Sequence, residues 1–207
     1  MNRLITFGCS HTEGSSLPQS NEQVWGKIVS KHLGLEFVNE GIYRSSNKLI
    51  AHQVRNFNFL PTDTVVVLWS YTLRHTKLES KYSFEHFTPK NEKRINKTYY
   101  KYFYSDYDSE FTSKVYVNYI LHYLLSSGIK FSFAGITHDT LNNLTDINDY
   151  NLPIDFEHYQ ARYKISTLDK HLGVLGNVIY GNDMTEKILD KGYTPFVDFK
   201  PFPVNLL

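Results

Sequence analysis

The chain of 207 residues contains one cysteine, Cys9, so no disulfide can form within it. Small secreted domains usually depend on disulfides, and their absence is typical of a protein from a reducing compartment. Long apolar stretches are also missing, because the longest run, Val65 to Trp69, is far too short to cross a bilayer. The N-terminal segment has too short an apolar stretch for a signal peptide. The sequence therefore predicts a cytoplasmic protein without a membrane partner.

Neither sign of charge dominates, because 22 lysines and arginines face 21 aspartates and glutamates, for a net charge of +1. This balance argues against a broad electrostatic surface for nucleic acid or anionic lipid. Glycine-rich nucleotide motifs and the Gly-x-Ser-x-Gly elbow of α/β-hydrolases are absent. The pairs His138-Asp139 and Glu157-His158 lack metal-ligand spacing. We therefore expect no cofactor, no metal site and no nucleic-acid partner, while the oligomeric state stays open.

Apolar residues alternate between strand-like runs and helical spacing along the chain. Strands are predicted at 3–8, 35–38, 64–69 and 129–134, and helices at 24–33, 47–59, 111–126 and 174–189. Gly181-Asn182 marks a point where the last helix can break. Such alternation favours a mostly parallel sheet with helices on both faces. We predict one three-layer α/β/α domain over 1–207, with a parallel sheet of five strands or slightly fewer in flavodoxin-like order.

Three segments do not follow this alternation. Residues 137–160 are rich in Asn and Asp, and the tail 194–203 is apolar, punctuated by proline and expected to be extended. Residues 75–108 form an aromatic-rich insertion. Its stretch 99–107 favours rings that pack the insertion onto the domain, and a wall against which sugars stack is an alternative. A platform for single-stranded nucleic acid is disfavoured by the acidic residues that follow, Asp106, Asp108 and Glu110.

Polar residues that follow the strands are the candidates for chemistry, since functional groups gather at the carboxyl ends of parallel strands. Ser10 follows the first strand, where its backbone N–H can face an oxyanion, although a serine there can also simply cap a turn. His171 precedes the last helix, and a positioned histidine can take the proton of a serine hydroxyl. Asp169 is the local candidate to orient that imidazole. His11 is a candidate substrate contact or a surface turn residue.

The combination resembles the SGNH, or GDSL-like, hydrolase family. Gly8-Cys9-Ser10 is similar to the family's Gly-Asp-Ser element, and Asn39 to Asn47 to its Asn-x-Gly-x-x-Gly-x-Ser/Thr loop. Asp169-Lys170-His171 is similar to its Asp-x-x-His element, one residue shorter. The resemblance covers the whole chain in order and spacing. It implies Ser10 as nucleophile, His171 as base and Asp169 as its partner, with Ser10, Gly41, Arg44 and Ser70 around the oxyanion.

Several positions depart from the family pattern. Arg44 stands in place of the second glycine, and it takes a positive φ less readily than glycine does. The family's third element supplies an Asn to the oxyanion, whereas here the chain reads Leu68 to Arg74 without Asn. Ser70, Tyr71 or Arg74 could donate instead. Losing one oxyanion donor typically costs ~10²–10³ in rate, so a weak or specialised enzyme is consistent with this departure. The pattern of Trp69-Ser70 with Arg74 is similar to a branch common in phage genomes.

The resemblance implies a serine esterase that works through an acyl-enzyme. The aromatic insertion suggests an O-acylated carbohydrate as substrate, and a short-chain acyl ester or a lipid stays an open alternative. Beyond the nucleophile, we predict substrate contacts from His11, Asn47, Tyr71 and Arg74. The alternative is a weak or inactive member of the fold, used for binding or structure, such as a virion or surface component that recognises glycans.

Overall fold

The computed structural model describes residues 2–80, 83–89, 91–137, 141, 151, 152, 154 and 156–190, with only the backbone of Ser20 and Asn21. Four parallel strands form the central sheet in the order β2-β1-β3-β6. They are β1 (Arg3–Gly8), β2 (Glu36–Gly41), β3 (Thr64–Trp69) and β6 (Lys130–Gly135). This confirms the predicted flavodoxin-like order with a sheet slightly smaller than five strands.

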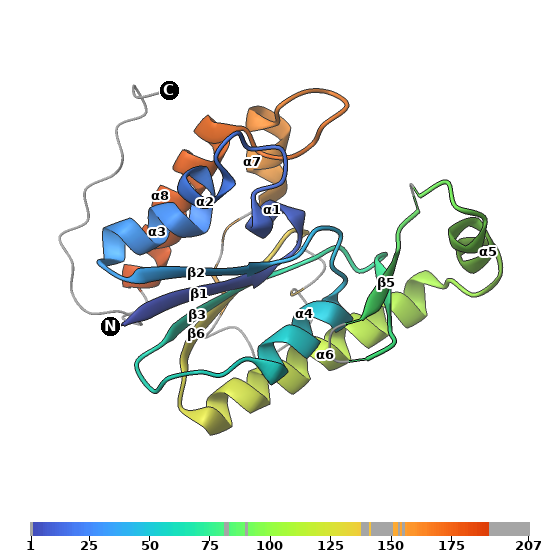
Figure 1. The fold of residues 1–207 in the computed structure, drawn as a ribbon, viewed down its shortest axis with the longest axis horizontal. Coiled ribbons are helices and arrows are strands. Elements are labelled where there is room, and N and C mark those ends of the chain that lie inside the picture. Colours follow the sequence, from blue (N-terminus) through green and yellow to red (C-terminus); the bar gives the residue numbers. More distant parts are fainter. Residues whose placement is uncertain are drawn as a thin grey trace.

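Helices cover both faces of this sheet, which makes the three layers visible in Figure 1. One face carries α3 (Trp25–Leu33), α7 (Phe156–Tyr163) and α8 (Val174–Asp190). The other carries α4 (Asn47–Asn56) and α6 (Asp106–Ser127). Two short helices follow β1, namely α1 (Ser10–Glu13) and α2 (Ser20–Gln23). Among the described residues, no helix has the length and apolar character needed to cross a membrane.

The strands are buried on both faces, which explains why β3 reads as a continuous apolar run. Val65, Val67 and Trp69 point into the core beneath α4 and α6. Val66 and Leu68 point into the second core, beneath α3 and α8. Successive side chains of a strand alternate between faces, so one run serves both cores. All four predicted strands are present, but the second runs from Glu36 to Gly41 rather than over 35–38, because it pairs with β1 as far as Gly8.

The helix boundaries differ from the predicted ones where local contacts decide them. The fourth helix ends at Asn56, because Phe57 is extended and packs its ring edge against Phe7 at 5.5 Å. The sixth begins at Asp106, because Ser105 caps it by accepting the backbone N–H of Asp108. The last helix is not broken at Gly181. A Cβ there would press on Ile28, so this glycine lets α8 lie close to α3.

The predicted insertion contains the antiparallel hairpin β4 (His75–Leu78) and β5 (Phe84–Phe87), followed by α5 (Arg94–Tyr102), and it projects from the body in Figure 1. Tyr99 stacks on His75 at 4.9 Å. The hydroxyl of Tyr100 lies 2.7 and 2.9 Å from the carbonyl oxygens of Leu73 and Phe87. These contacts support the packing interpretation for Tyr99 and Tyr100. The tail 194–203 and the pair His138-Asp139 lie outside the described residues.

Candidate active site

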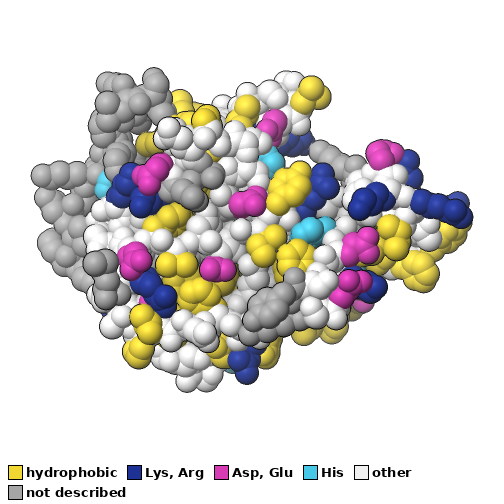
Figure 2. All heavy atoms as spheres, viewed as in Figure 1, with side chains coloured by type: hydrophobic (Ala, Val, Ile, Leu, Met, Phe, Trp, Pro, Cys, Tyr) yellow, Lys and Arg dark blue, Asp and Glu magenta, His cyan; other side chains and the backbone are white. Residues whose placement is uncertain are grey.

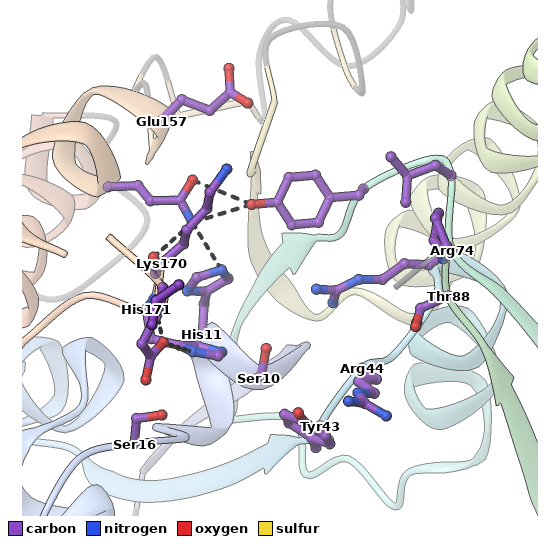
Figure 3. A pocket seen from close by; sticks show the side chains of 16 residues that line it. Ser10, His11, Ser16, Tyr43, Arg44, Arg74, Thr88, Glu157, Lys170 and His171 are labelled. Atoms are coloured by element: carbon purple, nitrogen blue, oxygen red, sulfur yellow. Dashed lines mark hydrogen bonds and ion pairs between the residues drawn. The ribbon is translucent and has the colours of Figure 1, made fainter. Parts of the chain in front are cut away.

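A cavity of about 620 Å³ opens at the carboxyl ends of β1, β2 and β3 (Figure 3). This is the edge at which the sequence predicted the functional residues. Most of the predicted site residues line this cavity with polar or aromatic side chains. They are Ser10, His11, Arg44, Tyr71, Arg74, Asp169 and His171. Figure 2 shows the surface as a mixture of charges without a single-sign field on the face it presents.

Two glycines place Ser10 in the cavity by letting α1 sit against the strand ends. Gly8 and Gly41 are opposite one another in the β1–β2 register. A Cβ at Gly8 would overlap the side chain of Thr12, and one at Gly41 would overlap the backbone of Glu13. Ser10 is thereby the first residue of α1, where its backbone N–H has no carbonyl partner one turn earlier. The Gly8 and Gly41 positions thus fix how closely the nucleophile candidate approaches the sheet.

Gly41 does not serve as a predicted oxyanion donor. Its N–H donates to the side-chain oxygen of Asn39 at 3.0 Å, and it does not line the cavity. Asn39, the asparagine of the second motif, therefore accepts the hydrogen bond of the Gly41 N–H, and that N–H is not available to an oxyanion. The role of Gly41 is close packing against α1.

Asp169 and His171 form a compact pair. Nδ1 of His171 lies 2.6 Å from Oδ1 of Asp169, and the backbone N–H of His171 donates to the same oxygen at 3.0 Å. The chain curls locally, so a carboxylate only two residues away reaches the ring. That backbone hydrogen bond, more than those from the Ser16 hydroxyl and the imidazole, lowers the pKa of Asp169 to about 2, against the smaller opposing effect of burial. The carboxylate is therefore ionised at neutral pH, with Nδ1 of His171 as its partner.

The loop that carries this pair is fastened at both ends. Ile165 N–H donates to the carbonyl of His171 at 2.9 Å, and Gly173 N–H to that of Tyr163 at 2.9 Å. Gln160 donates to the carbonyl of Lys170 at 2.8 Å. These bonds hold the loop on α7 and leave the imidazole facing the cavity. Sequence reasoning missed Gln160 and Ser16, because neither belongs to a motif and their role depends on where α7 and the first loop pack.

His11 is buried, so its interpretation as a surface turn residue is wrong. Its ring lies 4.7 Å from that of Phe156 and 4.7 Å from that of His171, measured between centroids. Burial, and after it the neighbouring His171 and Arg74, lowers the pKa of His11 well below its usual value. His11 is therefore neutral at physiological pH. It lines the cavity beside the nucleophile candidate and forms one side of the packing around His171.

Ser10 and His171 line the same cavity, but no hydrogen bond joins them in the described part of the chain. The predicted ~3 Å contact between Ser10 Oγ and a ring nitrogen is therefore not formed in this structure. Because Nδ1 of His171 is paired with Asp169, Nε2 is the ring nitrogen that can accept a proton. Catalytic hydrogen bonds are often long in sites without ligand and tighten when substrate binds.

Arg44, which stands in place of the second motif's glycine, adopts the left-handed conformation with φ of 61°. A residue with a Cβ pays about 1–2 kcal/mol for that backbone, so local strain is accepted here. Its guanidinium lies 4.8 Å from the ring centre of Tyr43.

Ser70 and Asn47 do not reach the cavity, contrary to their predicted roles as oxyanion and substrate contacts. Both are buried, and they bind one another: Ser70 N–H donates to Oδ1 of Asn47 at 2.7 Å, and Asn47 Nδ2 donates to the Ser70 carbonyl at 3.1 Å. The pair clamps the start of α4 to the end of β3. Ser70 Oγ accepts from Nη1 of Arg74 at 3.1 Å, so Ser70 positions an arginine that does line the cavity.

Metal chemistry has no evident donor set here. Within residues 2–137 and 156–190, apart from the gaps named above, no three His, Cys, Asp or Glu side chains gather as ligands would. The potential ligand nearest to His171, Asp169, is already committed to the imidazole.

Comparison with solved structures places the fold. A member of the lipolytic G-D-S-L family from Veillonella parvula matches with a TM-score of 0.51 and 14% identity over 92% of this chain and 97% of that one. An acetyl xylan esterase, AlAXEase, matches with 0.51 and 17% over 91% and 100%. A two-domain esterase active on acetylated mannans matches with 0.56 and 15% over 98% of this chain and 53% of that one.

No protein-family model and no curated protein matches the sequence. The structural matches cover nearly the whole chain at low identity, so they report on architecture rather than on closely shared residues. They confirm the architecture that the resemblance implied. This chain has the SGNH hydrolase fold, which it shares with GDSL lipolytic proteins and acetyl xylan esterases.

Proposed function

We propose that this protein is a carboxylic ester hydrolase in which Ser10 attacks the acyl carbon, with an O-acylated carbohydrate as substrate. The observation that carries this proposal is the Asp169–His171 pair at 2.6 Å in the same cavity as Ser10. A serine hydroxyl needs a positioned base, and an imidazole needs an orienting acceptor on its other nitrogen. The fold shared with acetyl xylan and mannan esterases supports this substrate class.

The reaction follows from the placement of these groups. Nε2 of His171 takes the proton of Ser10 as Oγ bonds to the acyl carbon, and the ionised Asp169 stabilises the imidazolium that forms. His171 then returns the proton to the departing sugar oxygen, which leaves an acyl-Ser10. A water that gives one proton to His171 attacks the acyl carbon of this ester, and His171 returns that proton to Ser10 Oγ as the acid leaves, which restores both residues.

Charge on the carbonyl oxygen requires donors at the cavity floor. Ser10 at the start of α1 and the left-handed Arg44 offer backbone N–H groups at the positions that the family motif implies. Arg74 reaches the cavity from the segment where the family has its Asn, and Ser70 holds it there. A charged guanidinium donor is stronger than a neutral amide, so Arg74 offsets the loss of the Asn.

The experiment is labelling by a fluorophosphonate probe, combined with release of p-nitrophenol from p-nitrophenyl acetate. Labelling of the wild type, lost in Ser10→Ala and kept in Ser126→Ala, an exposed serine of α6, is the expected result. Acetate release from acetylated mannan or xylan then tests the carbohydrate class. A wild-type protein that is folded but neither labelled nor active would favour the alternative, a glycan-binding module. The missing Ser10–His171 hydrogen bond is the observation that favours that alternative.

A further inference from the structure

The two sides of the cavity differ in charge. Figure 3 shows Glu157, Lys170 and His171 on one side of Ser10, and Arg44, Arg74 and Thr88 on the other. The carboxylates that line the cavity, Glu157 and Asp169, come from α7 and from the loop before α8. The arginine side comes from the loops after β2 and β3, and it contributes no carboxylate to the cavity lining in the described residues.

The contacts described for the two arginines of this side are made with neutral groups. In the part of the chain that the structure describes, no ion pair includes Arg44 or Arg74. Arg74 donates to Ser70 Oγ and lies 4.9 Å from the ring centre of Tyr71. Arg44 lies over Tyr43. Among the described residues each guanidinium is thus held by neutral groups, and its five N–H groups leave donors for a ligand.

The two guanidinium groups act on the same region. His86 of β5 has a lowered pKa, caused first by burial and then by the positive charges of Arg44 and Arg74. Both cations are therefore close enough to His86 for their fields to overlap there. In the proposed reaction the oxyanion uses the Ser10 and Arg44 backbone amides and one N–H group of Arg74. The Arg44 guanidinium and the remaining N–H groups of Arg74 are then left to bind another group of the substrate.

We infer that Arg44 and Arg74 form a subsite for an anionic group of the substrate, so that the acylated sugar carries a carboxylate or a phosphate near its ester. This inference rests on the proposed function for its link to catalysis, although the subsite itself is a binding property. Guanidinium forks match both anions by paired N–H···O bonds. The ester of such a sugar would lie over Ser10 with the acid group toward the insertion, where Thr88 and Pro89 complete the wall.

Equilibrium binding of unacylated sugars tests the subsite without any turnover. Titration calorimetry compares trigalacturonate with mannotriose, and mannose 6-phosphate with mannose, at low and high ionic strength. We expect at least one anionic sugar to bind about tenfold more tightly than its neutral counterpart, a difference of about 1.4 kcal/mol. Tighter binding of trigalacturonate would identify the anionic group as a carboxylate, and tighter binding of mannose 6-phosphate would identify it as a phosphate. High salt should weaken the binding of the anionic sugar and leave that of the neutral sugar unchanged.

Variants locate the effect. Arg44→Gln and Arg74→Gln should each abolish most of the preference, and Arg44→Lys should keep part of it. Lys130→Gln removes the same charge at the opposite end of the sheet and should leave the preference intact. Equal binding of anionic and neutral sugars, absence of binding by all of them, or equal loss in Lys130→Gln would overturn the inference. Circular dichroism checks that each variant is folded. Labelling of Ser10 by the fluorophosphonate probe tests the proposed hydrolase separately, so failure of the subsite inference can be told from failure of the proposed function.

Discussion

One carboxylate oxygen of Asp169 lies 2.6 Å from Nδ1 of His171 and 3.0 Å from the backbone nitrogen of the same residue. The aspartate therefore orients the imidazole and fixes the turn that carries it. A ring held in this way presents Nε2 as the basic nitrogen. The spacing of two residues, shorter than in the family motif, is accommodated because the backbone curls around the carboxylate.

The first prediction follows from this double contact. Asp169→Asn removes the negative charge that stabilises the imidazolium and permits the wrong tautomer, so kcat should fall by about 10²–10⁴. Steady-state hydrolysis of p-nitrophenyl acetate measures it. Asp190→Asn, at the exposed end of α8, is the control and should keep wild-type kcat. Wild-type kcat in Asp169→Asn would reduce the role of this aspartate to shaping the loop.

Strain at Arg44 gives a stability prediction. Glycine accepts a φ of 61° without a Cβ penalty, whereas alanine keeps that penalty and loses the arginine contacts. Arg44→Gly should therefore be about 1 kcal/mol more stable than Arg44→Ala. Urea unfolding of the two variants measures the difference. Equal free energies of unfolding would mean that the left-handed backbone costs nothing at this site.

Close approach of α1 to β2 predicts the effect of Gly41→Ala. The added methyl would overlap the backbone of Thr12 and Glu13, which no side-chain rotation can relieve. Unfolding free energy should fall by about 1–3 kcal/mol, and Ser10 should shift with α1. Gly173→Ala is the matched control, because its nearest neighbour would be Tyr163 O at 3.5 Å, and about 0.5 kcal/mol or less is expected. Equal destabilisation by both changes would remove the argument.

Burial of neutral His11 predicts a dependence of stability on pH. Below about pH 6.5 the unfolded chain takes a proton on this residue while the native chain does not, because its native pKa is lowered. Protonation thus favours unfolding, and stability is lost as the pH falls from about 6.5 toward the native pKa. The contribution of one such group is at most about 1.4 kcal/mol per pH unit.

Comparison of the wild type with His11→Phe isolates this contribution, because other histidines with lowered pKa, such as His32 and His86, remain in both proteins. Unfolding free energies are measured at about pH 7.5 and 5.5, roughly one unit either side of the pKa of an unfolded histidine. The unfolding free energy of the wild type should fall more between these pH values than that of His11→Phe, since only the wild type carries the buried imidazole. An equal fall in both proteins would show that the pKa of His11 is not lowered by folding.

Much of the fold could be predicted from the sequence, because buried strands and helices show a characteristic local spacing of apolar residues. The apolar run of β3 and the helical spacing of α3 and α8 are such patterns. Gly34 ends α3 and Gly128 ends α6, each in the left-handed conformation. The end of α4 at Asn56 was missed, because the extended Phe57 packs on Phe7, fifty positions away in the chain. Similarly, the unbroken α8 depends on Ile28.

The candidate site divides in the same way. The sequence by itself predicted Ser10, Asp169 and His171 as one site, because each follows a strand or precedes a helix in a recognisable order, and the three line one cavity. Only the tertiary structure decided that Ser70 and Asn47 bind one another and that the Gly41 N–H donates to Asn39. It also decided that Arg74, rather than Ser70, lines the cavity. Hydrogen-bond partners between distant segments depend on how the layers pack, and residue order along one strand end holds no record of that packing.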